Sequence, residues 1–192
     1  MSQEVQSVPT HKEPIRCFIV GCPRSGTTLL TSIIAGHPKV FGVLKESHFF
    51  SAQRARVRGQ ASSGHFEKFD SFRAVLNNGA LGAPGDPLPE PSAFISALDD
   101  MAGRSDMLGW VEKTPENLHH IEAILSAAPD ARFIHVVRNA GTTLASGFAK
   151  SFRSQSCVWN PAYKSFRAAY NEWMRAMEAT RRWQSHPHHR SY

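Results

Sequence analysis

The chain has 192 residues, which is the length of one domain and allows it to bury roughly 70% of its unfolded surface. Hydrophobic residues make up 41% of the sequence, as in an ordinary soluble protein, and the formal net charge is +6. The basic residues are scattered rather than clustered with aromatic ones, which argues against a nucleic-acid-binding protein. The positive excess fits a basic surface and also a cleft that attracts a polyanionic ligand.

The N-terminal segment, residues 1–14, is a polar tail without the apolar run of a signal peptide. No window approaches the roughly 18 apolar residues that a transmembrane helix needs. The three cysteines, Cys17, Cys22 and Cys157, show no Cys-x-x-Cys spacing, which indicates a reducing and hence cytoplasmic compartment. We expect Cys17 in the core, whereas Cys22 lies beside an electropositive loop and is either an inert packing thiol or a somewhat activated one.

The first structural unit, residues 15–36, reads as a strand, a glycine-containing turn and a helix. Residues 17–20 are apolar, as in a short buried strand, and helical spacing of apolar residues runs from 29 to 36. The intervening loop brings backbone N–H groups and a helix N-terminus toward one point, which favours a bound anion. Arg24 adds a charge that can contact two oxygens at once. Hydroxyl donors come from Ser25, Thr27 and Thr28.

The loop differs from the common ATP-binding loop. A Walker A loop reads G-x-x-x-x-G-K-[ST], and Gly21 and Gly26 have its glycine spacing. However, Thr27 occupies the lysine position, and the strand predicted at 132–137 is followed by Arg138 where a nucleotide triphosphatase needs an acidic residue for Mg²⁺. The loop therefore predicts a phosphate or sulfate site without the charges that ATP and magnesium require.

Residues 40–44 read as a second strand, which leads into Glu46 and His48. A strand, helix and strand of this length form a parallel βαβ unit, and ligands collect at the carboxyl ends of such strands. Glu46 and His48 are therefore expected at the same edge of the sheet as Arg24. Either residue could instead form an ordinary ion pair or hydrogen bond on a loop.

Residues 51–106 interrupt the alternation of strands and helices as an irregular insertion, which we expect to act as a lid or as a wall of the binding site. It contains a short helix at 67–76 and a second helix that begins at the N-cap Ser92 and ends at Gly103. The three arginines between residues 54 and 58 are expected on a solvated face, with a site for an acidic acceptor as the alternative.

The C-terminal half returns to strands and helices. Residues 107–111 and 132–137 read as buried strands, and a helix begins at Pro115 between them. His135, within the second of these strands, is expected as a hydrogen-bonded core residue. Two helices and a polar tail complete the chain, at residues 141–152, from Asn160 onward and at 185–192. These elements predict a three-layer α/β domain over residues 15–184, with a parallel sheet and a P-loop-like first βα unit.

A second cationic group is predicted where the strand at 132–137 ends. Arg138 follows that strand, and Ser146 and Lys150 lie one turn apart on the next helix. We expect these three side chains to surround one anion. Two cationic sites, one at each strand end, would then hold opposite ends of a single doubly charged nucleotide.

Three motifs together resemble the sulfotransferases that use 3′-phosphoadenosine 5′-phosphosulfate (PAPS). The run 23–30 resembles their 5′-phosphosulfate loop, and is most similar to the arginine-bearing branch that includes tyrosylprotein and many bacterial sulfotransferases. Arg138 and Ser146 resemble the 3′-phosphate motif, although Ala140 and its neighbours replace the proline and aspartate often found there. The segment 112–115, Glu-Lys-Thr-Pro, is similar to the lysine-containing stretch between them. Members of the family usually continue into another strand and a late basic loop, so this chain looks C-terminally short.

The resemblance implies transfer of a sulfuryl group from PAPS to an acceptor hydroxyl, or less readily to an amine, with 3′-phosphoadenosine 5′-phosphate (PAP) as product and no metal. Arg24 and Lys113 would stabilise the charge on the leaving phosphate. Glu46 would act as the base, with His48 as the alternative. The residues implied to bind the nucleotide are Arg24, Ser25, Gly26, Thr27, Thr28 and Leu29 at the 5′ end, and Arg138, Ser146 and Lys150 at the 3′-phosphate.

The acceptor is implied to be a small molecule, a peptide or a carbohydrate, and the segment 51–106 that should shape its site carries no readable motif. Two other functions stay open. A nucleotide kinase-like P-loop enzyme would need the loop lysine, which is absent here. An inactive fragment that binds PAP or PAPS is compatible with the short C-terminus.

Overall fold

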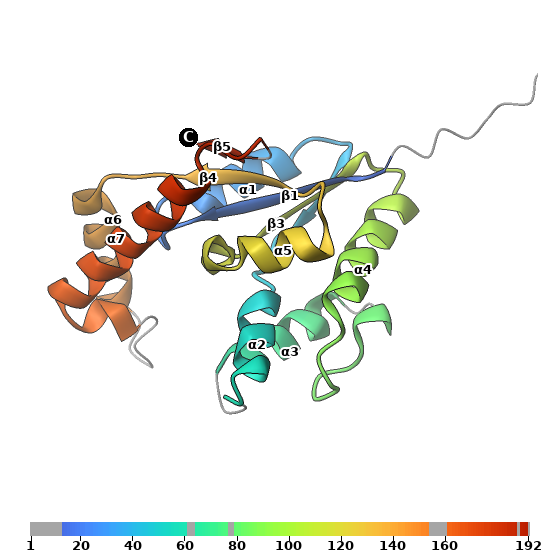
Figure 1. Cartoon of the computed structure of the whole chain (residues 1–192), viewed down its shortest axis with the longest axis horizontal. Coiled ribbons are helices and arrows are strands. Elements are labelled where there is room, and N and C mark those ends of the chain that lie inside the picture. Colours follow the sequence, from blue (N-terminus) through green and yellow to red (C-terminus); the bar gives the residue numbers. More distant parts are fainter. Residues whose placement is uncertain (1–12, 61–63, 77–78, 154–160, 188, 192) are drawn as a thin grey trace, which may run out of the picture.

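The computed structural model describes residues 13–60, 64–76, 79–153, 161–187 and 189–191. At its centre lies a parallel sheet with the strand order β2-β3-β1-β4-β5 (Figure 1). Its strands are β1 (Ile15–Gly21), β2 (Val40–Val43), β3 (Gly109–Lys113), β4 (Arg132–Val136) and β5 (His189–Ser191). Because the strands run in the same direction, their carboxyl ends meet at one edge, where the candidate site lies.

The central strand β1 is buried because it pairs with β3 on one side and β4 on the other. Phe18, Ile19 and Val20 are fully buried, as the apolar run at 17–20 predicted. The Phe18 ring packs edge-on against Trp110 of β3, with ring centroids 5.1 Å apart, and stacks on Phe133 of β4 at 5.6 Å. These aromatic contacts fix β1 and its following loop between the two neighbouring strands.

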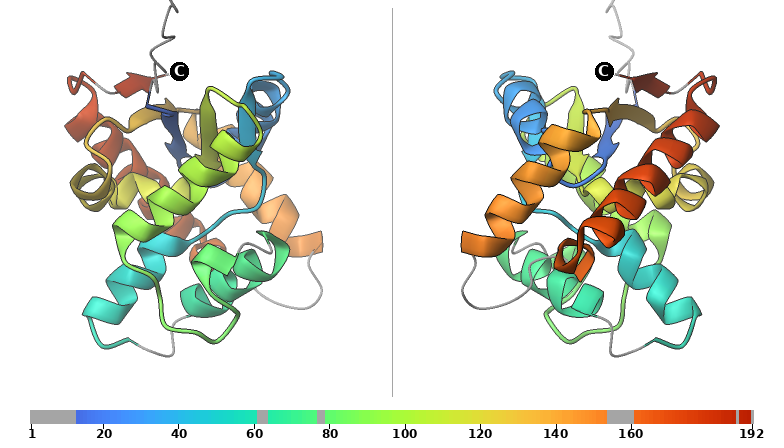
Figure 2. Two further views of the ribbon diagram at one scale, coloured as in Figure 1. Left: turned by 90° about the vertical axis from the view of Figure 1, so that its right-hand side faces the viewer. Right: turned by 90° about the vertical axis from the view of Figure 1, so that its left-hand side faces the viewer.

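Helices cover both faces of the sheet (Figures 1 and 2). Helix α1 lies on one face, whereas α4 and α5 lie against the other, with α2 and α3 beyond them. Helices α6 and α7 pack side by side near the edge at which β1 and β4 end. The bounds are α1 (Thr27–Ala35), α2 (Phe49–Val57), α3 (Gly64–Leu76), α4 (Pro91–Arg104), α5 (Ile121–Ala127), α6 (Ala140–Arg153) and α7 (Phe166–Trp183), with 3₁₀ turns η1 (Gly79–Leu81), η2 (Pro115–His119) and η3 (Pro161–Lys164). The predicted three-layer α/β architecture is confirmed.

Helix α1 agrees with its predicted extent but buries a polar face. Thr27 and Thr31 are buried, whereas Leu29 and Ile33 are 68% and 64% exposed. The cause is the close approach of α1 to β2, where a Cβ on Gly42 would collide with the side chain of Ala35. Only small side chains fit such a contact; Leu29 and Ile33 face outward, whereas Leu30 and Ile34 are half-buried.

The insertion 51–106 is more regular than expected, because α2 precedes the predicted helix at 67–76. Helix α2 buries six of its residues, Phe49, Phe50, Ser51, Ala52, Gln53 and Ala55, on more than one side. A helix enclosed in this way has no single apolar stripe, so periodicity could not reveal it. Helix α4 also begins earlier than predicted, with Glu90 rather than Ser92 as N-cap and Pro91 as its first residue.

Two further corrections concern the C-terminal part. Helix α7 begins at Phe166, with the Ser165 hydroxyl accepting a hydrogen bond from the Ala168 amide, and not at Asn160, which lies outside the described residues. Residues 189–191, predicted to belong to a polar tail, form β5 beside β4. The expectation that no further strand follows was therefore wrong. Cys157 and residues 1–12 also lie outside the described ranges.

Helix α7 is the longest helix in the described part of the chain, with 18 residues. Charged residues occur along its whole length, and none of the described helices combines the length and apolar character needed to cross a bilayer.

Candidate active site

The loop between β1 and α1 is held in a compact turn by its glycines and one backbone hydrogen bond. A Cβ on Gly21 would lie 2.6 Å from the carbonyl oxygen of Val136, so only glycine fits where β1 ends beside β4. The Ser25 amide donates to the Cys22 carbonyl at 3.1 Å, and Gly26 adopts a φ of 112° as the N-cap of α1. Arg24 has a φ of 74°, a strained conformation for a residue with a side chain.

This turn leaves hydrogen-bond donors available to an anion. The first intrahelical bond of α1 runs from the Leu30 amide to the Gly26 carbonyl, so the amides of residues 27–29 have no acceptor within the helix. The Ser25 hydroxyl is buried, and its oxygen has no hydrogen-bond partner among the described residues. A buried hydroxyl without a partner is costly unless a ligand satisfies it, which supports the predicted phosphate or sulfate site.

A cleft of about 810 Å³ opens beside this loop, at the carboxyl ends of the central strands. It brings together seven of the residues singled out from the sequence, namely Arg24, Thr27, Thr28, Glu46, His48, Lys113 and Lys150. The other predicted site residues, Ser25, Gly26, Leu29, Arg138 and Ser146, do not line it. Its walls come from segments far apart in the sequence, because the parallel sheet collects their ends at one edge.

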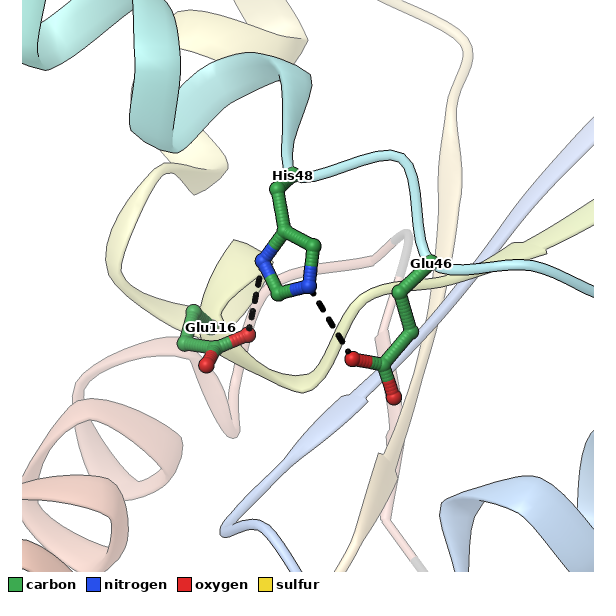
Figure 3. A group of neighbouring side chains, drawn as sticks. All are labelled: Glu46, His48 and Glu116. Carbon is green, nitrogen blue, oxygen red and sulfur yellow. Dashed lines mark ion pairs between the residues drawn. The ribbon is translucent and has the colours of Figure 1, made fainter. Parts of the chain in front are cut away.

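Glu46 and Lys113 form an ion pair inside the cleft. The Lys113 ammonium donates to Glu46 Oε1, and the second carboxylate oxygen lies 3.2 Å from His48 Nε2 (Figure 3). Burial alone would raise the pKa of Glu46, but the hydrogen bonds from His48 and Lys113 outweigh it and lower this pKa to about 2. Glu46 is therefore ionised in this arrangement and is a weak proton acceptor while Lys113 remains bound to it.

His48 lies between two carboxylates, with Glu46 on one side and Glu116 on the other (Figure 3). Its Nδ1 is 3.6 Å from Glu116 Oε2. The residue is buried and has a φ of 51°, so the surrounding contacts hold a strained backbone in place. Since a carboxylate oxygen lies opposite each ring nitrogen, the imidazole can donate to both only when it carries both protons.

Glu46, His48 and Glu116 also form the one group in the described residues with the composition of a metal site, because their ligand atoms lie within 4.8 Å of one another. The arrangement fits a metal ion poorly. A cation bound to Nε2 would lie on the Glu46 side of the ring, away from Glu116, and Lys113 already occupies the other oxygen of Glu46. The group is better described as a chain of ion pairs.

Hydrogen bonds hold the segment that carries Glu46 and His48 against the end of β3. The fully buried Glu112 carboxylate accepts hydrogen bonds from the Ser47 hydroxyl at 2.9 Å, the Ser47 amide at 3.3 Å and the Asn117 side chain at 2.8 Å. Burial raises the pKa of Glu112, and the hydrogen bonds from Thr114 and Ser47 oppose that rise. Glu112 thus has a positioning role, which the motif at 112–115 alone did not indicate.

The residues predicted for a second anion site are distributed differently from the expectation. Ser146 accepts a hydrogen bond from Arg24 Nε at 3.2 Å, and Lys150 lines the cleft, whereas Arg138 lies outside it and donates to Thr142 at 2.9 Å. Arg138 and Lys150 are twelve residues apart in mostly helical chain, a rise of about 18 Å, so only their extended side chains could approach one anion. Arg138 nevertheless lies close to the loop, because its Nη1 is 3.4 Å from the Arg24 carbonyl oxygen.

Comparison with known proteins identifies the family. The sequence model of the sulfotransferase family matches residues 16–192. The chain belongs to the sulfotransferase family. It is 25% identical over 174 residues to the nodulation protein NoeE of Sinorhizobium fredii, an alignment that covers 82% of this chain and 36% of NoeE. The chain therefore spans about a third of the length of this relative.

Solved structures of sulfotransferases share the fold. The sulfotransferase domain of the curacin biosynthetic pathway superposes with a TM-score of 0.58 at 17% identity, covering 93% of this chain and 66% of that domain. The sulfotransferase STF9 of Mycobacterium avium gives a TM-score of 0.54 at 17% identity, covering 94% and 59%. At such identities these structures support the fold of the sulfotransferase domain rather than a particular acceptor.

Several residues that line the cleft of this sulfotransferase chain were not predicted. They are Lys45, His65, Lys68, Ser71, Glu116 and Glu172, among others. Glu116 follows the motif at 112–115 directly, so its place after a strand end could have indicated it. Glu172 comes from α7 and carried no local signal. His65 and Lys68 belong to α3, within the insertion that was expected to form a wall of the site.

The remaining histidine and cysteine predictions have clear outcomes. His135 is buried with its Nδ1 3.3 Å from the Thr180 hydroxyl, which confirms a hydrogen-bonded core residue, and burial lowers its pKa to about 4. Cys22 is buried, and this burial raises its pKa to about 12. Cys22 is therefore the inert thiol of the two alternatives. Cys17 was expected in the core but is only half-buried, although desolvation still raises its pKa to about 12.

Proposed function

We propose that this protein transfers the sulfuryl group of PAPS to an acceptor hydroxyl, or less readily to an amine. The observation that carries the proposal is the convergence of Arg24, Lys113 and Lys150 on one cleft beside a loop with unsatisfied donors. Sulfuryl transfer needs a leaving phosphate to be neutralised and an acceptor to be aligned behind the sulfur. Arg24, Lys113 and Lys150 together would neutralise the leaving phosphate without Mg²⁺.

The donor would bind with its 5′-phosphosulfate on the loop. The amides of residues 27–29, the Ser25 hydroxyl and Arg24 would donate to its oxygens. The exposed Leu29 side chain offers an apolar surface next to these donors. Arg138 is our candidate for the 3′-phosphate, because it is charged and exposed and its Nη1 lies 3.4 Å from the Arg24 carbonyl oxygen of the loop. Ser146 would orient Arg24 rather than contact the 3′-phosphate.

Lys113 would change partners during the reaction. In the structure it is bound to Glu46. Once the donor is present, Lys113 would stabilise the charge on the leaving phosphate oxygen, and its departure from Glu46 would remove one cause of the low pKa. Glu46 would then accept the hydroxyl proton while the new S–O bond forms and the S–O bond to the phosphate breaks. His48, held between Glu46 and Glu116, would keep Glu46 in position.

Nucleotide binding tests the donor assignment directly. Calorimetry should find PAP bound more tightly than ATP or adenosine 5′-phosphate. Arg138→Ala should weaken PAP binding by about tenfold to a hundredfold and leave adenosine 5′-phosphate nearly unchanged, because charge-assisted hydrogen bonds to one phosphate are lost. Arg132→Ala, at the opposite end of β4 and also exposed, is the matched control. Equal weakening of both nucleotides would contradict the 3′-phosphate assignment.

Measurements of turnover test the roles proposed for Arg24 and Glu46. Release of PAP from PAPS across a panel of hydroxyl and amine acceptors should fall at least about a hundredfold in Arg24→Ala, because a cation at the developing charge is lost. Glu46→Gln should lower kcat with little change in the affinity for PAP. Unchanged turnover in Glu46→Gln together with lost turnover in His48→Asn would make His48 the base. PAP binding without transfer to any acceptor would favour an inactive nucleotide-binding protein, and ATP hydrolysis insensitive to PAP would favour the kinase-like alternative.

A further inference from the structure

A second hollow, of about 440 Å³, adjoins the cleft on the far side of Glu116. His65, Glu116 and Glu172 line both spaces, so the two hollows adjoin at these residues. The remaining walls come from α2, η2 and α7. The second hollow has no lining residue from the donor loop, so a ligand with its reactive group at Glu46 would enter it by passing these shared residues.

The second hollow carries positive charge that the protein does not neutralise. Arg54, in the last turn of α2, and Arg58, the C-cap of that helix, line the hollow, and no ion pair or side-chain hydrogen bond joins either to another described residue. The acidic residues nearby have other partners, since Glu172 pairs with Arg175 at 2.6 Å and Glu116 faces His48.

The histidines of the hollow respond to this charge. His120 has its Nε2 3.2 Å from the Ser51 hydroxyl, and its pKa is lowered to about 4 by burial first and then by the positive charges of Arg54 and neighbouring groups. Burial also lowers the pKa of His119; Glu172 opposes this shift, whereas Arg175 and Arg54 add to it. Both imidazoles are therefore neutral polar groups near pH 7, and the two unpaired arginines supply the charge.

We infer that the second hollow binds an anionic group of the acceptor, a carboxylate or a sulfate ester, while the acceptor hydroxyl lies at Glu46. The inference rests on the proposed function, because it assigns the acceptor end of that site. The donor phosphates would have their own cations in Arg24, Lys113 and Lys150, which line the cleft and not the second hollow. Arg56 belongs to the same helix but pairs with Glu90 at 3.4 Å and does not line the hollow.

The test follows the imidazole NMR resonances of His119 and His120 in protein saturated with PAP. Methyl β-glucuronide is the anionic probe, methyl β-glucoside its neutral counterpart and inorganic sulfate the free anion. We expect saturable shifts with the glucuronide and none with the glucoside. The double variant Arg54→Ala/Arg58→Ala should bind the glucuronide at least about tenfold more weakly, as the loss of charge-assisted hydrogen bonds predicts, and Arg56→Ala should bind it unchanged.

Three results would overturn the inference: no saturable shift in the wild type, equal shifts with the glucoside, or undiminished binding in the double variant. Equal affinity for inorganic sulfate would overturn the acceptor assignment in favour of a site for small free anions. Because Arg54, Arg56 and Arg58 are exposed, the variants should fold, which matching thermal unfolding curves would verify. If PAP fails to bind, the proposed function fails, yet the same titration of the unloaded protein still tests the hollow through its own histidines.

Discussion

The ion pair between Glu46 and Lys113 makes the stability of the protein depend on pH in a defined direction. Glu46 has a pKa of about 2 against an ordinary value of 4.5, a difference worth about 3 kcal/mol at roughly 1.4 kcal/mol per unit. The side chain is 35% exposed, so solvent screening reduces this to about 1–2 kcal/mol. Because the pKa in the folded state is the lower one, this contribution is complete above pH 4.5 and is lost as the pH falls from there toward 2.

Glu46→Gln should therefore be less stable than the wild type at pH 7 by about 1–2 kcal/mol, since the buried Lys113 also loses its counter-charge. The difference should shrink as the pH is lowered below about 4.5, because the wild-type carboxylate becomes protonated while the amide cannot. Urea denaturation followed by circular dichroism at several pH values between about 7 and 3 measures both curves.

The matched control is Glu122→Gln. Glu122 forms an ion pair with Arg182 in which both side chains are more than two-thirds exposed, so its removal should change stability by less than about 0.5 kcal/mol at any of these pH values. If Glu46→Gln and the wild type keep the same stability difference from neutral to acidic pH, the ion pair does not lower the pKa of Glu46. The reasoning about Lys113 as a shared cation would then fail as well.

Three further predictions follow from buried groups. Ser25→Ala should change the free energy of unfolding by less than about 0.5 kcal/mol, because the Ser25 hydroxyl has no partner among the described residues to lose. Calorimetry should find that the variant binds PAP more weakly. A large loss of stability would instead mean that the hydroxyl already has a hydrogen-bond partner. Glu112→Ala should cost about 2–4 kcal/mol in urea denaturation, because Ser47 and Asn117 lose buried hydrogen bonds, and a cost below about 1 kcal/mol would argue against its positioning role. Cys22, with a pKa of about 12, should not react with a thiol reagent near pH 8 until the protein unfolds, and rapid modification of the native protein would contradict its burial.

The first βα unit was predictable because its signals are local. A short apolar run, two glycines at fixed spacing and a helical pattern occupy about twenty consecutive residues, and each has a direct backbone consequence. The structure confirms a strand, a turn and a helix in this order, although β1 (Ile15–Gly21) extends beyond the predicted run 17–20 at both ends. The same locality explains why His135 was recognised as a core residue within an otherwise apolar strand.

Elements without local periodicity were not predictable. Helix α2 is enclosed on several sides, and the polar strand β5 forms because β4 offers it a pairing edge. The spacing of Arg138, Ser146 and Lys150 did not reveal that Ser146 accepts a hydrogen bond from Arg24 or that Lys150 lines the same cleft as Arg24. Spacing along a helix gives the face on which residues lie, but not which distant group they meet.

By itself, the sequence determined the α/β class, the family and the residue types at the strand ends, because periodicity and motif spacing act over short stretches of chain. Only the tertiary structure decided that Lys113 pairs with Glu46, that Glu116 lies opposite Glu46 across His48, and that Arg54 and Arg58 line a hollow next to the cleft. These contacts join residues from different strands, helices and loops. The distances between these residues depend on how the parallel sheet brings the carboxyl ends of its strands to one edge. No single stretch of sequence determines that arrangement.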